Sequence, residues 1–322
     1  MRPASYTVLG IDVGGTKVAA GLVELPSGQM LARRQIPTRP GRGGAALLED
    51  IRWLVSELTA EPGPGVPPPS ALGIGICELV SQDGEILSQN AIPWTAAEVQ
   101  LQLKDLGPVV LEADVRAAAR AESRLGAGGR FQSFLYVTIG TGISSCLVLA
   151  GQPYLGARGL TGTLASSPVT VPCGETDILT RRSLEELASG PALVRRFRDA
   201  GGDPVLTAPE VLEAAHAGDL TARRIVLTAA EALGSALGLL VNVLDPEAVI
   251  LGGGLGLSTG LFSDTLDAAI RRHIWSPVNR GLPILRARTG PDAGILGAAL
   301  AAASALAPET PGAPEIPPAG PS

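Results

Sequence analysis

The stretch GIDVGGTK at residues 10–17 decides how the rest of the chain is interpreted. It belongs to an apolar run that begins at Val8, and a second apolar run, AAGLVEL, occupies residues 19–25. Two apolar strands joined by a glycine-rich turn predict a β-hairpin. The glycines also let the backbone approach an anion, to which Thr16 adds a hydroxyl and Lys17 a positive charge. An ordinary hairpin turn and a phosphate-binding turn are both compatible with this segment.

Asp12 adds a metal-binding group to the same stretch. Its carboxylate is suited to Mg²⁺, held directly or through water, because Mg²⁺ prefers oxygen ligands. The spacing of Gly14 and Gly15 matches neither the Walker loop nor the Gly-x-Gly-x-x-Gly fingerprint. The stretch therefore implies neither of those folds, and a hairpin with a capping aspartate is the alternative to a phosphate turn.

Two further glycine clusters follow apolar runs later in the chain. TIGTGIS at 138–144 lies within 134–151, which repeats the strand–turn–strand pattern of 8–25 and suggests an internal duplication. Thr141 and its neighbouring glycines can donate N–H and O–H groups to a polyphosphate. ILGGGLG at 250–256 allows the close approach of a flat ligand such as a nucleoside. Each cluster alone also fits a tight turn or a helix start, and only their common position after a strand favours ligand binding.

Asp114 is the candidate catalytic carboxylate. It follows the apolar run VVLEA and begins a predicted Ala-rich helix. Ligands of open α/β sheets bind at the carboxyl ends of strands, and a carboxylate there can accept a proton from a hydroxyl nucleophile. Aspartate is also a favoured helix N-cap, and the two roles do not exclude each other.

Alternating strands and helices predict the α/β class with two similar halves. An Asp-Gly turn within 82–89 predicts an additional short strand, and the proline-rich segment 62–69 a loop. The predicted helices are 43–61, 115–128, 220–246, 260–275 and 294–307. The predicted strands, besides those that flank the two turns, are 71–80, 107–114, 247–254 and 282–288.

The composition limits the classes to which the protein can belong. The 322 residues suffice for two domains, and 45% apolar against 17% charged residues allow a large core. A net charge of −6 offers no basic footprint for nucleic acid. No uninterrupted apolar run reaches the roughly 18 residues that span a bilayer, and the first residues lack the pattern of a secretory signal. Three widely spaced cysteines fit reduced thiols. We therefore expect a cytoplasmic protein without nucleic-acid or membrane partners.

The order of these motifs resembles the ROK family of the actin-like ATPase superfamily, which contains bacterial sugar kinases and transcriptional repressors. The resemblance covers about residues 6–307 and implies two actin-like (ribonuclease H-like) domains with a nucleotide and substrate cleft between them. The implied N-terminal domain is 1–115, with the helix at 294–307 packing back on it, and the C-terminal domain is 116–293. The proline-rich tail, 308–322, is expected to be disordered.

The resemblance also implies roles for the motif residues. Asp114 would take a proton from the acceptor hydroxyl as it attacks the γ-phosphoryl group of ATP, and Asp12 would hold Mg²⁺. The residues implied to bind ATP form three groups: Asp12, Gly14, Gly15, Thr16 and Lys17; Thr138, Gly140, Thr141 and Gly142; and Gly252, Gly253 and Gly254 near the adenosine.

The acceptor side departs from the family pattern. Ala113 stands where sugar kinases have Asn before the catalytic Asp, and Cys77 and Glu78 replace part of a Gly-x-Pro-Gly segment. In GTLAS, at 162–166, Thr163 replaces the sugar-binding Glu and Ser166 a His. Removing a charged acceptor of sugar hydroxyls is expected to change the substrate.

The family's zinc site is also incomplete in this sequence. Only Cys173 remains of its three cysteines, and Ser183 stands where the last should be. A structural zinc ion requires four ligands, so we expect no zinc.

Four acceptor-side residues are candidates for substrate contacts: Asn90, Glu185, Glu78 and Thr163. Asn90 and Trp94 match the family's Asn-x-x-x-Trp. Asn90 is either a turn residue or a ligand contact, whereas Trp94 is expected in the core. Glu185 matches a family residue that reaches the sugar. Glu78 is either a substitute polar group in the cleft or, the reading that we favour, a solvated loop residue.

The prediction is an ATP- and Mg²⁺-dependent kinase that phosphorylates a hydroxyl of a hexose, amino sugar or cyclitol, and that forms a homodimer by analogy. The alternative is a non-catalytic ligand sensor that keeps the nucleotide fold, and a third reading is an ATPase that acts as a conformational partner of another protein. A repressor is disfavoured, because only five residues precede the first strand.

Overall fold

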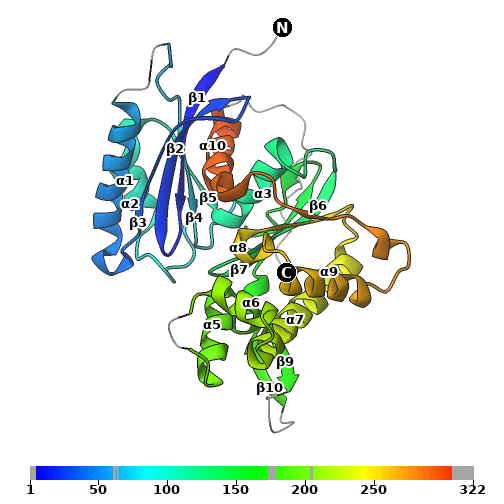
Figure 1. Ribbon diagram of the computed structural model, residues 1–322. Coiled ribbons are helices and arrows are strands. Elements are labelled where there is room, and N and C mark those ends of the chain that lie inside the picture. Colours follow the sequence, from blue (N-terminus) through cyan, green and yellow to red (C-terminus); the bar gives the residue numbers. More distant parts are fainter. Residues whose placement is uncertain (1–4, 61–62, 64, 173–178, 204–205, 307–322) are drawn as a thin grey trace, which may run out of the picture.

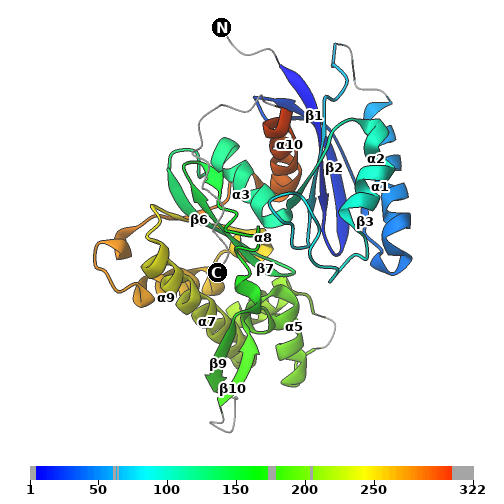
Figure 2. The same cartoon turned by 180° about the vertical axis from the view of Figure 1, so that it is seen from behind.

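Two five-stranded sheets, with helices α3 (Asp114–Leu125) and α10 (Ala293–Leu306) between them, form the scaffold (Figures 1 and 2). The computed structural model describes residues 5–60, 63, 65–172, 179–203 and 206–306. The predicted tail 308–322, Cys173 and part of the predicted loop 62–69 lie outside the described residues. The predicted α/β class is confirmed.

The first sheet has the order β3-β2-β1-β4-β5. Strands β1, β2 and β3 are antiparallel, whereas β4 and β5 run parallel to β1. Helices α1 and α2 cover one face, and α10 packs on the other (Figure 1). Its elements are β1 (Tyr6–Val13), β2 (Lys17–Leu25), β3 (Gln29–Pro37), α1 (Gly43–Thr59), β4 (Leu72–Ile76), α2 (Ala96–Leu103) and β5 (Val109–Ala113).

The second sheet has the order β12-β11-β6-β7-β8. Its β6–β7 hairpin with the parallel strand β11 repeats the β1–β2 hairpin with β4, as the suggested duplication predicts. The long helix α7 lies in the core on one face, and α3 packs on the other. The main elements of this half are α3 (Asp114–Leu125), β6 (Ser133–Ile139), β7 (Ile143–Leu149), β8 (Gln152–Pro153), α4 (Leu184–Ala188), α5 (Gly190–Asp199), α6 (Ala208–His216), α7 (Leu220–Leu244), β11 (Val249–Gly252), α8 (Gly253–Gly256), α9 (Leu261–His273) and β12 (Ile284–Arg286). After β12 the chain returns to the first sheet as α10 (Ala293–Leu306). A separate two-stranded sheet consists of β9 (Pro168–Pro172) and β10 (Leu179–Ser183).

The small residues of α10 allow it to lie unusually close to its neighbours. An added Cβ at Gly73 of β4 would lie 1.9 Å from the carbonyl oxygen of Ala298, and one at Gly297 would lie 1.7 Å from that of Ala117 in α3. Side chains at these two positions would overlap backbone, which cannot yield as a flexible side chain can. The glycines therefore fix the distance of α10 from the first sheet and from α3.

The segment after β4 differs from the prediction. The strand expected over 71–80 ends at Ile76, and the strand expected within 82–89 is reduced to a single bridge between Val80 and Ile86. The hydroxyl of Ser81 accepts hydrogen bonds from the backbone N–H groups of Asp83 and Glu85. Such local side-chain bonds offer the backbone an alternative to a ladder.

By length and composition, α7 is the one described helix that would suffice to cross a membrane. Half of its most apolar window is buried inside the protein. The helix supplies Leu233, Leu237 and Val241 to the core, each with no exposed surface. Its apolar character is therefore that of a core helix.

Candidate active site

The two predicted carboxylates lie at the same edge of the first sheet. Strands β1, β4 and β5 are parallel, and Asp12 pairs with Gly75 of β4, whose neighbour Ile76 pairs with Ala113. Asp114 follows directly as the first residue of α3. This is the edge where open α/β sheets bind ligands.

Burial raises the pKa values of both carboxylates toward neutrality. Burial raises the pKa of Asp114 to about 7, and the charges of Asp12 and Glu78 raise it further against the hydrogen bond from the Val115 N–H. Burial also raises the pKa of Asp12 to about 6, although Lys17 opposes the shift. A carboxylate whose pKa lies near neutrality is suited to act as a general base.

Asp114 opens onto a hollow of about 120 Å³ between the two halves of the molecule. Asn90, Glu78 and Thr163 line it together with Asp114, so the structure brings four of the predicted residues to one place. The polar residues that complete the lining are Ser88, Arg116, Ser144 and Thr161. Small polar groups around a carboxylate can bind a molecule that carries several hydroxyl groups.

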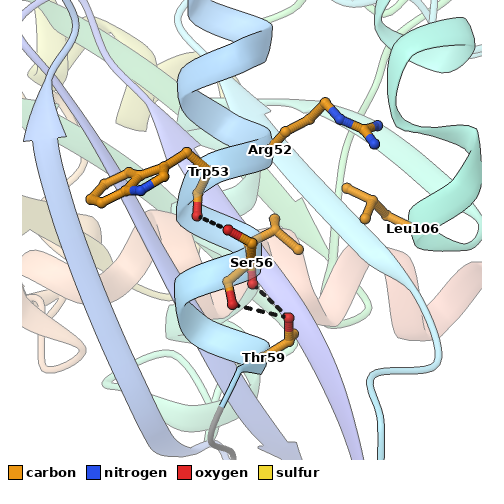
Figure 3. Close-up of a pocket in the computed structure, with 6 residues that line it drawn as sticks. Arg52, Trp53, Ser56, Thr59 and Leu106 are labelled. Carbon is orange, nitrogen blue, oxygen red and sulfur yellow. Dashed lines mark hydrogen bonds between the residues drawn. The ribbon is translucent and has the colours of Figure 1, made fainter.

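A larger hollow of about 380 Å³ lies along α1, away from these carboxylates (Figure 3). Arg52, Trp53, Ser56 and Leu106 line it. The Ser56 hydroxyl donates to the backbone oxygen of Trp53, and the Thr59 hydroxyl donates to that of Ser56 (Figure 3). Among the described residues, its lining includes no carboxylate and no predicted site residue. The smaller hollow is therefore the candidate active site.

Glu78 is not a solvated loop residue. Only 5% of it is exposed, and its carboxylate accepts hydrogen bonds from the N–H groups of Asn90, Ala91 and Ile92 and from the hydroxyl of Ser88. These bonds lower its pKa although burial opposes them. The favoured reading of Glu78 is thus wrong, because residues 88–92 fold back over this side chain.

The loop that Glu78 holds contains two of the residues in question. Asn90 is exposed on the rim of the hollow. Trp94 is 1% exposed and belongs to the core of the first sheet, as predicted. The Asn90 N–H donates to Glu78, which fixes the backbone at this point of the rim.

The first glycine turn closes tightly between β1 and β2. The Gly14 N–H donates to the carbonyl oxygen of Lys17 over 2.9 Å, and the Thr38 hydroxyl donates to the Gly14 carbonyl oxygen over 2.6 Å. Gly15 and Thr16 remain exposed at the tip, and an added Cβ at Gly15 would meet nothing within 4 Å. The tip of the turn is thus open to an approaching anion.

The second and third glycine clusters lie side by side. Gly252 pairs with Thr138 in neighbouring strands, and an added Cβ at Gly140 would lie 3.7 Å from the Gly254 nitrogen. Gly253 has a φ of +76°, and a Cβ there would lie 2.5 Å from the Ile139 carbonyl oxygen. Only glycine fits this contact. Thr141 and Gly142 complete the second turn.

The chain matches a family of known proteins. The model of the ROK family covers residues 8–305. The chain belongs to the ROK family. The predicted family and the predicted two-domain actin-like fold are thereby confirmed.

Relatives of this ROK chain include enzymes named for sugars. The bifunctional enzyme NanE/NanK of Brucella suis is 36% identical over 311 residues, which cover 94% of this chain and 54% of the relative. The chain thus spans about half the length of that protein. The N-acetylmannosamine kinase of Yersinia pseudotuberculosis is 31% identical, over 92% of this chain and 99% of the relative. A ROK glucokinase of Streptomyces griseus, solved with glucose and AMPPNP, has a TM-score of 0.76 and 28% identity over 92% of this chain and 99% of that one.

Glu185 lies beside the second ROK glycine turn rather than on the hollow. Its carboxylate accepts a hydrogen bond from the Ile143 N–H over 3.0 Å, and a Cβ at Gly142 would lie 2.7 Å from it. Glu185 is absent from the described lining of the hollow. Its present role is to support the turn.

Sequence reasoning missed Arg116, a buried residue that lines the hollow of this ROK protein. No clear signal for this role was present in the sequence, because Glu112 ends a strand while Arg116 lies in the first turn of the following helix. The ion pair between Arg116 and Glu112 is present in the structure. Ser144 and Thr161 carried no signal either, since their placement depends on how the second domain meets the first.

Proposed function

We propose that this protein is an ATP-dependent kinase that phosphorylates a hydroxyl group of a sugar or related polyol. The observation that carries the proposal is the position of Asp114, whose carboxylate has a pKa of about 7 at the sheet edge and faces a hollow lined by hydroxyl and amide groups. Relatives that are named N-acetylmannosamine kinase and glucokinase support this class of acceptor.

In this proposal Asp114 accepts the proton of the acceptor hydroxyl as its oxygen attacks the γ-phosphoryl group. The bond between that phosphorus and the bridging oxygen breaks, and ADP leaves with the electron pair. Transfer of this kind depends mainly on positioning and charge stabilisation. The exposed turn at Gly15 and Thr16 and the paired turns at Gly140 and Gly254 are proposed to hold the phosphates and the nucleoside.

Asp12 is proposed to hold Mg²⁺, directly or through water. Its hard carboxylate oxygens suit that ion, and the repulsion from Asp114 and Asp292 is of the kind that a cation relieves. Among the described residues, no group of three or more His, Cys, Asp or Glu side chains is arranged to hold a metal. That agrees with Mg²⁺, which usually takes one or two protein carboxylates together with substrate phosphates and waters. The bound ion would neutralise phosphate charge.

The acceptor is proposed to be a hexose, an amino sugar or a cyclitol. Thr163 and Asn90 on the rim of the hollow are uncharged hydrogen-bonding groups. The other carboxylate in its described lining, Glu78, is occupied by backbone N–H groups. An acceptor is therefore bound mostly by neutral donors and acceptors. Sites of this type discriminate strongly among substrates that differ by one hydroxyl.

The test is ADP release with ATP, Mg²⁺ and a panel of hexoses, N-acetylated amino sugars and cyclitols. We expect turnover on at least one compound and a loss on the order of 10²–10⁴-fold in Asp114→Asn. EDTA should abolish the activity, and added Mg²⁺ should restore it. Turnover that survives in Asp114→Asn would contradict the assigned base.

A ligand sensor without catalysis is the alternative. Tight binding of one of these compounds, measured by calorimetry, with no ADP release on any of them would favour it. We further propose domain boundaries at 1–115 and 116–293, a homodimer, a cytoplasmic location and no nucleic-acid or membrane partner. Light scattering tests the dimer, and elemental analysis tests the proposed absence of zinc.

A further inference from the structure

Two loops form opposite sides of the rim around Asp114. Residues 77–92 follow β4 of the first sheet, and residues 154–163 follow β8 of the second. The loops meet directly, because Gly159 has a φ of +75° and an added Cβ there would lie 2.7 Å from the Val80 carbonyl oxygen. Gln82 also donates a hydrogen bond to the carbonyl oxygen of Gly156. The candidate acceptor site is thus bounded by segments from both halves of the chain.

Arg116 joins the two loops from inside the molecule. Its Nη1 donates to the Gly159 carbonyl oxygen over 2.7 Å, and its Nη2 donates to the Val80 carbonyl oxygen over 2.9 Å. A single guanidinium therefore holds one carbonyl group from each loop. Two carbonyl oxygens directed at the same place repel each other without a shared donor, and the planar fork of arginine satisfies both at once.

The orientation of Arg116 is itself fixed. Its Nε donates to Glu112, and the side chains of Arg116 and Glu112 are only 3% and 9% exposed. A charge-assisted pair in such surroundings holds the guanidinium in one plane. Arg116 is also two residues after Asp114 in the first turn of α3, so the same helical turn positions the proposed base and the loops around it.

We propose that Arg116 is a positioning residue that fixes the two loops against each other and thereby shapes the acceptor site. The inference rests on the proposed function, since it assigns the hollow to the acceptor. If the proposal is correct, loss of Arg116 weakens binding of the acceptor but not binding of the nucleotide. The side chain of Arg116 bonds to Glu112, Gly159 and Val80, which lie outside the three glycine turns assigned to ATP.

The test compares KM values in Arg116→Lys and Arg116→Ala with those of the wild type. Lysine keeps the charge but lacks the fork, so both variants should raise the KM of the acceptor about tenfold or more. The KM of ATP should change by less than about twofold, because loss of one distant contact leaves the nucleotide side intact. Guanidinium added at millimolar concentration should partly restore acceptor binding to Arg116→Ala. A parallel rise of both KM values, or no change in the acceptor KM, would overturn the proposal.

Arg120 provides the matched control. It lies one turn later on α3, also contacts Glu112, at 3.4 Å, and donates to Gln152 rather than to either loop. Arg120→Ala should therefore leave the acceptor KM within about twofold of the wild type. If Arg120→Ala raised the acceptor KM as much as Arg116→Ala, the rise would come from disturbance of the helix and not of the loops.

A second variant and a second readout remain informative if Arg116→Ala folds poorly or if no acceptor is turned over. Gln82→Ala removes an exposed loop-to-loop bond and should raise the acceptor KM by about threefold. Hydrogen exchange should accelerate in both 79–87 and 154–164 in Arg116→Lys and in neither segment in Arg120→Ala. Unchanged exchange in Arg116→Lys would refute the positioning role, whereas absence of turnover in the wild type would refute only the proposed function.

Discussion

At the scale of single residues, the protonation of Asp114 sets the expected pH dependence. Burial raises its pKa to about 7, with Asp12 and Glu78 adding to the shift. The base is active when deprotonated, so kcat/KM should fall about tenfold per pH unit below pH 7. Glu78→Gln removes a negative charge and should lower the pKa of Asp114, which moves this acid limb to lower pH. A pH–rate profile of each protein measures the effect.

Asp83 is the matched control for this residue-scale prediction. It lies exposed on the same loop as Glu78 and is not among the charges that shift the pKa of Asp114. Asp83→Asn should leave the acid limb where it is in the wild type. An acid limb that stays in place or moves to higher pH in Glu78→Gln would contradict the assigned electrostatics.

At the scale of elements, the packing of α10 depends on the absence of side chains at its contacts. A Cβ at Gly297 would overlap the carbonyl oxygen of Ala117, so Gly297→Ala should lower the free energy of unfolding by about 1–3 kcal/mol or more. Gly281→Ala is the control, because an added Cβ there meets nothing within 4 Å and the change should stay within about 0.5 kcal/mol. Urea denaturation measures both. Equal stability of the two variants would mean that α10 shifts at little cost.

At the scale of the whole molecule, Glu122 holds together the segments that connect the two halves. This residue of α3 is fully buried and accepts hydrogen bonds from the N–H groups of Ala127, Arg288 and Thr289 and from the Thr289 hydroxyl. Residues 288 and 289 lead into α10. Glu122→Gln places an amide donor against these donors and should cost about 2–3 kcal/mol of unfolding free energy, measured by thermal denaturation.

Glu247→Gln is the comparison for this molecule-scale prediction. Glu247 likewise accepts two backbone N–H groups, from Gln132 and Ser133, but it is exposed. Water replaces its lost bonds, so the cost should be below about 1 kcal/mol. A larger loss in Glu247→Gln than in Glu122→Gln would show that burial at the junction of the two halves is not what makes Glu122 important.

The sequence was sufficient for the elements whose pattern is local. The hairpins around GIDVGGTK and TIGTGIS, the helix at Asp114 and the small-residue helix α10 follow from periodicity and glycine placement, and the structure has them within a few residues. The exposed strand β3 and the helices α4–α6 were not predicted, since their apolar patterns are short. The strand expected within 82–89 was wrong, since this segment forms a single bridge and the Ser81 hydroxyl binds the turn locally.

The residues of the candidate site also fall into those that a local pattern predicts and those that tertiary contacts place. By itself the sequence determined the family, the glycine turns and the position of Asp114 at a strand end, because these depend on residues that are neighbours in the chain. Only the tertiary structure decided that Glu78 is buried beneath residues 88–92, that Glu185 supports a turn, and that Arg116 joins two loops. Those roles are set by partners that lie 10 to 43 residues away in the chain. A local pattern carries no information on such partners, because it is the packing of the two halves that brings them together.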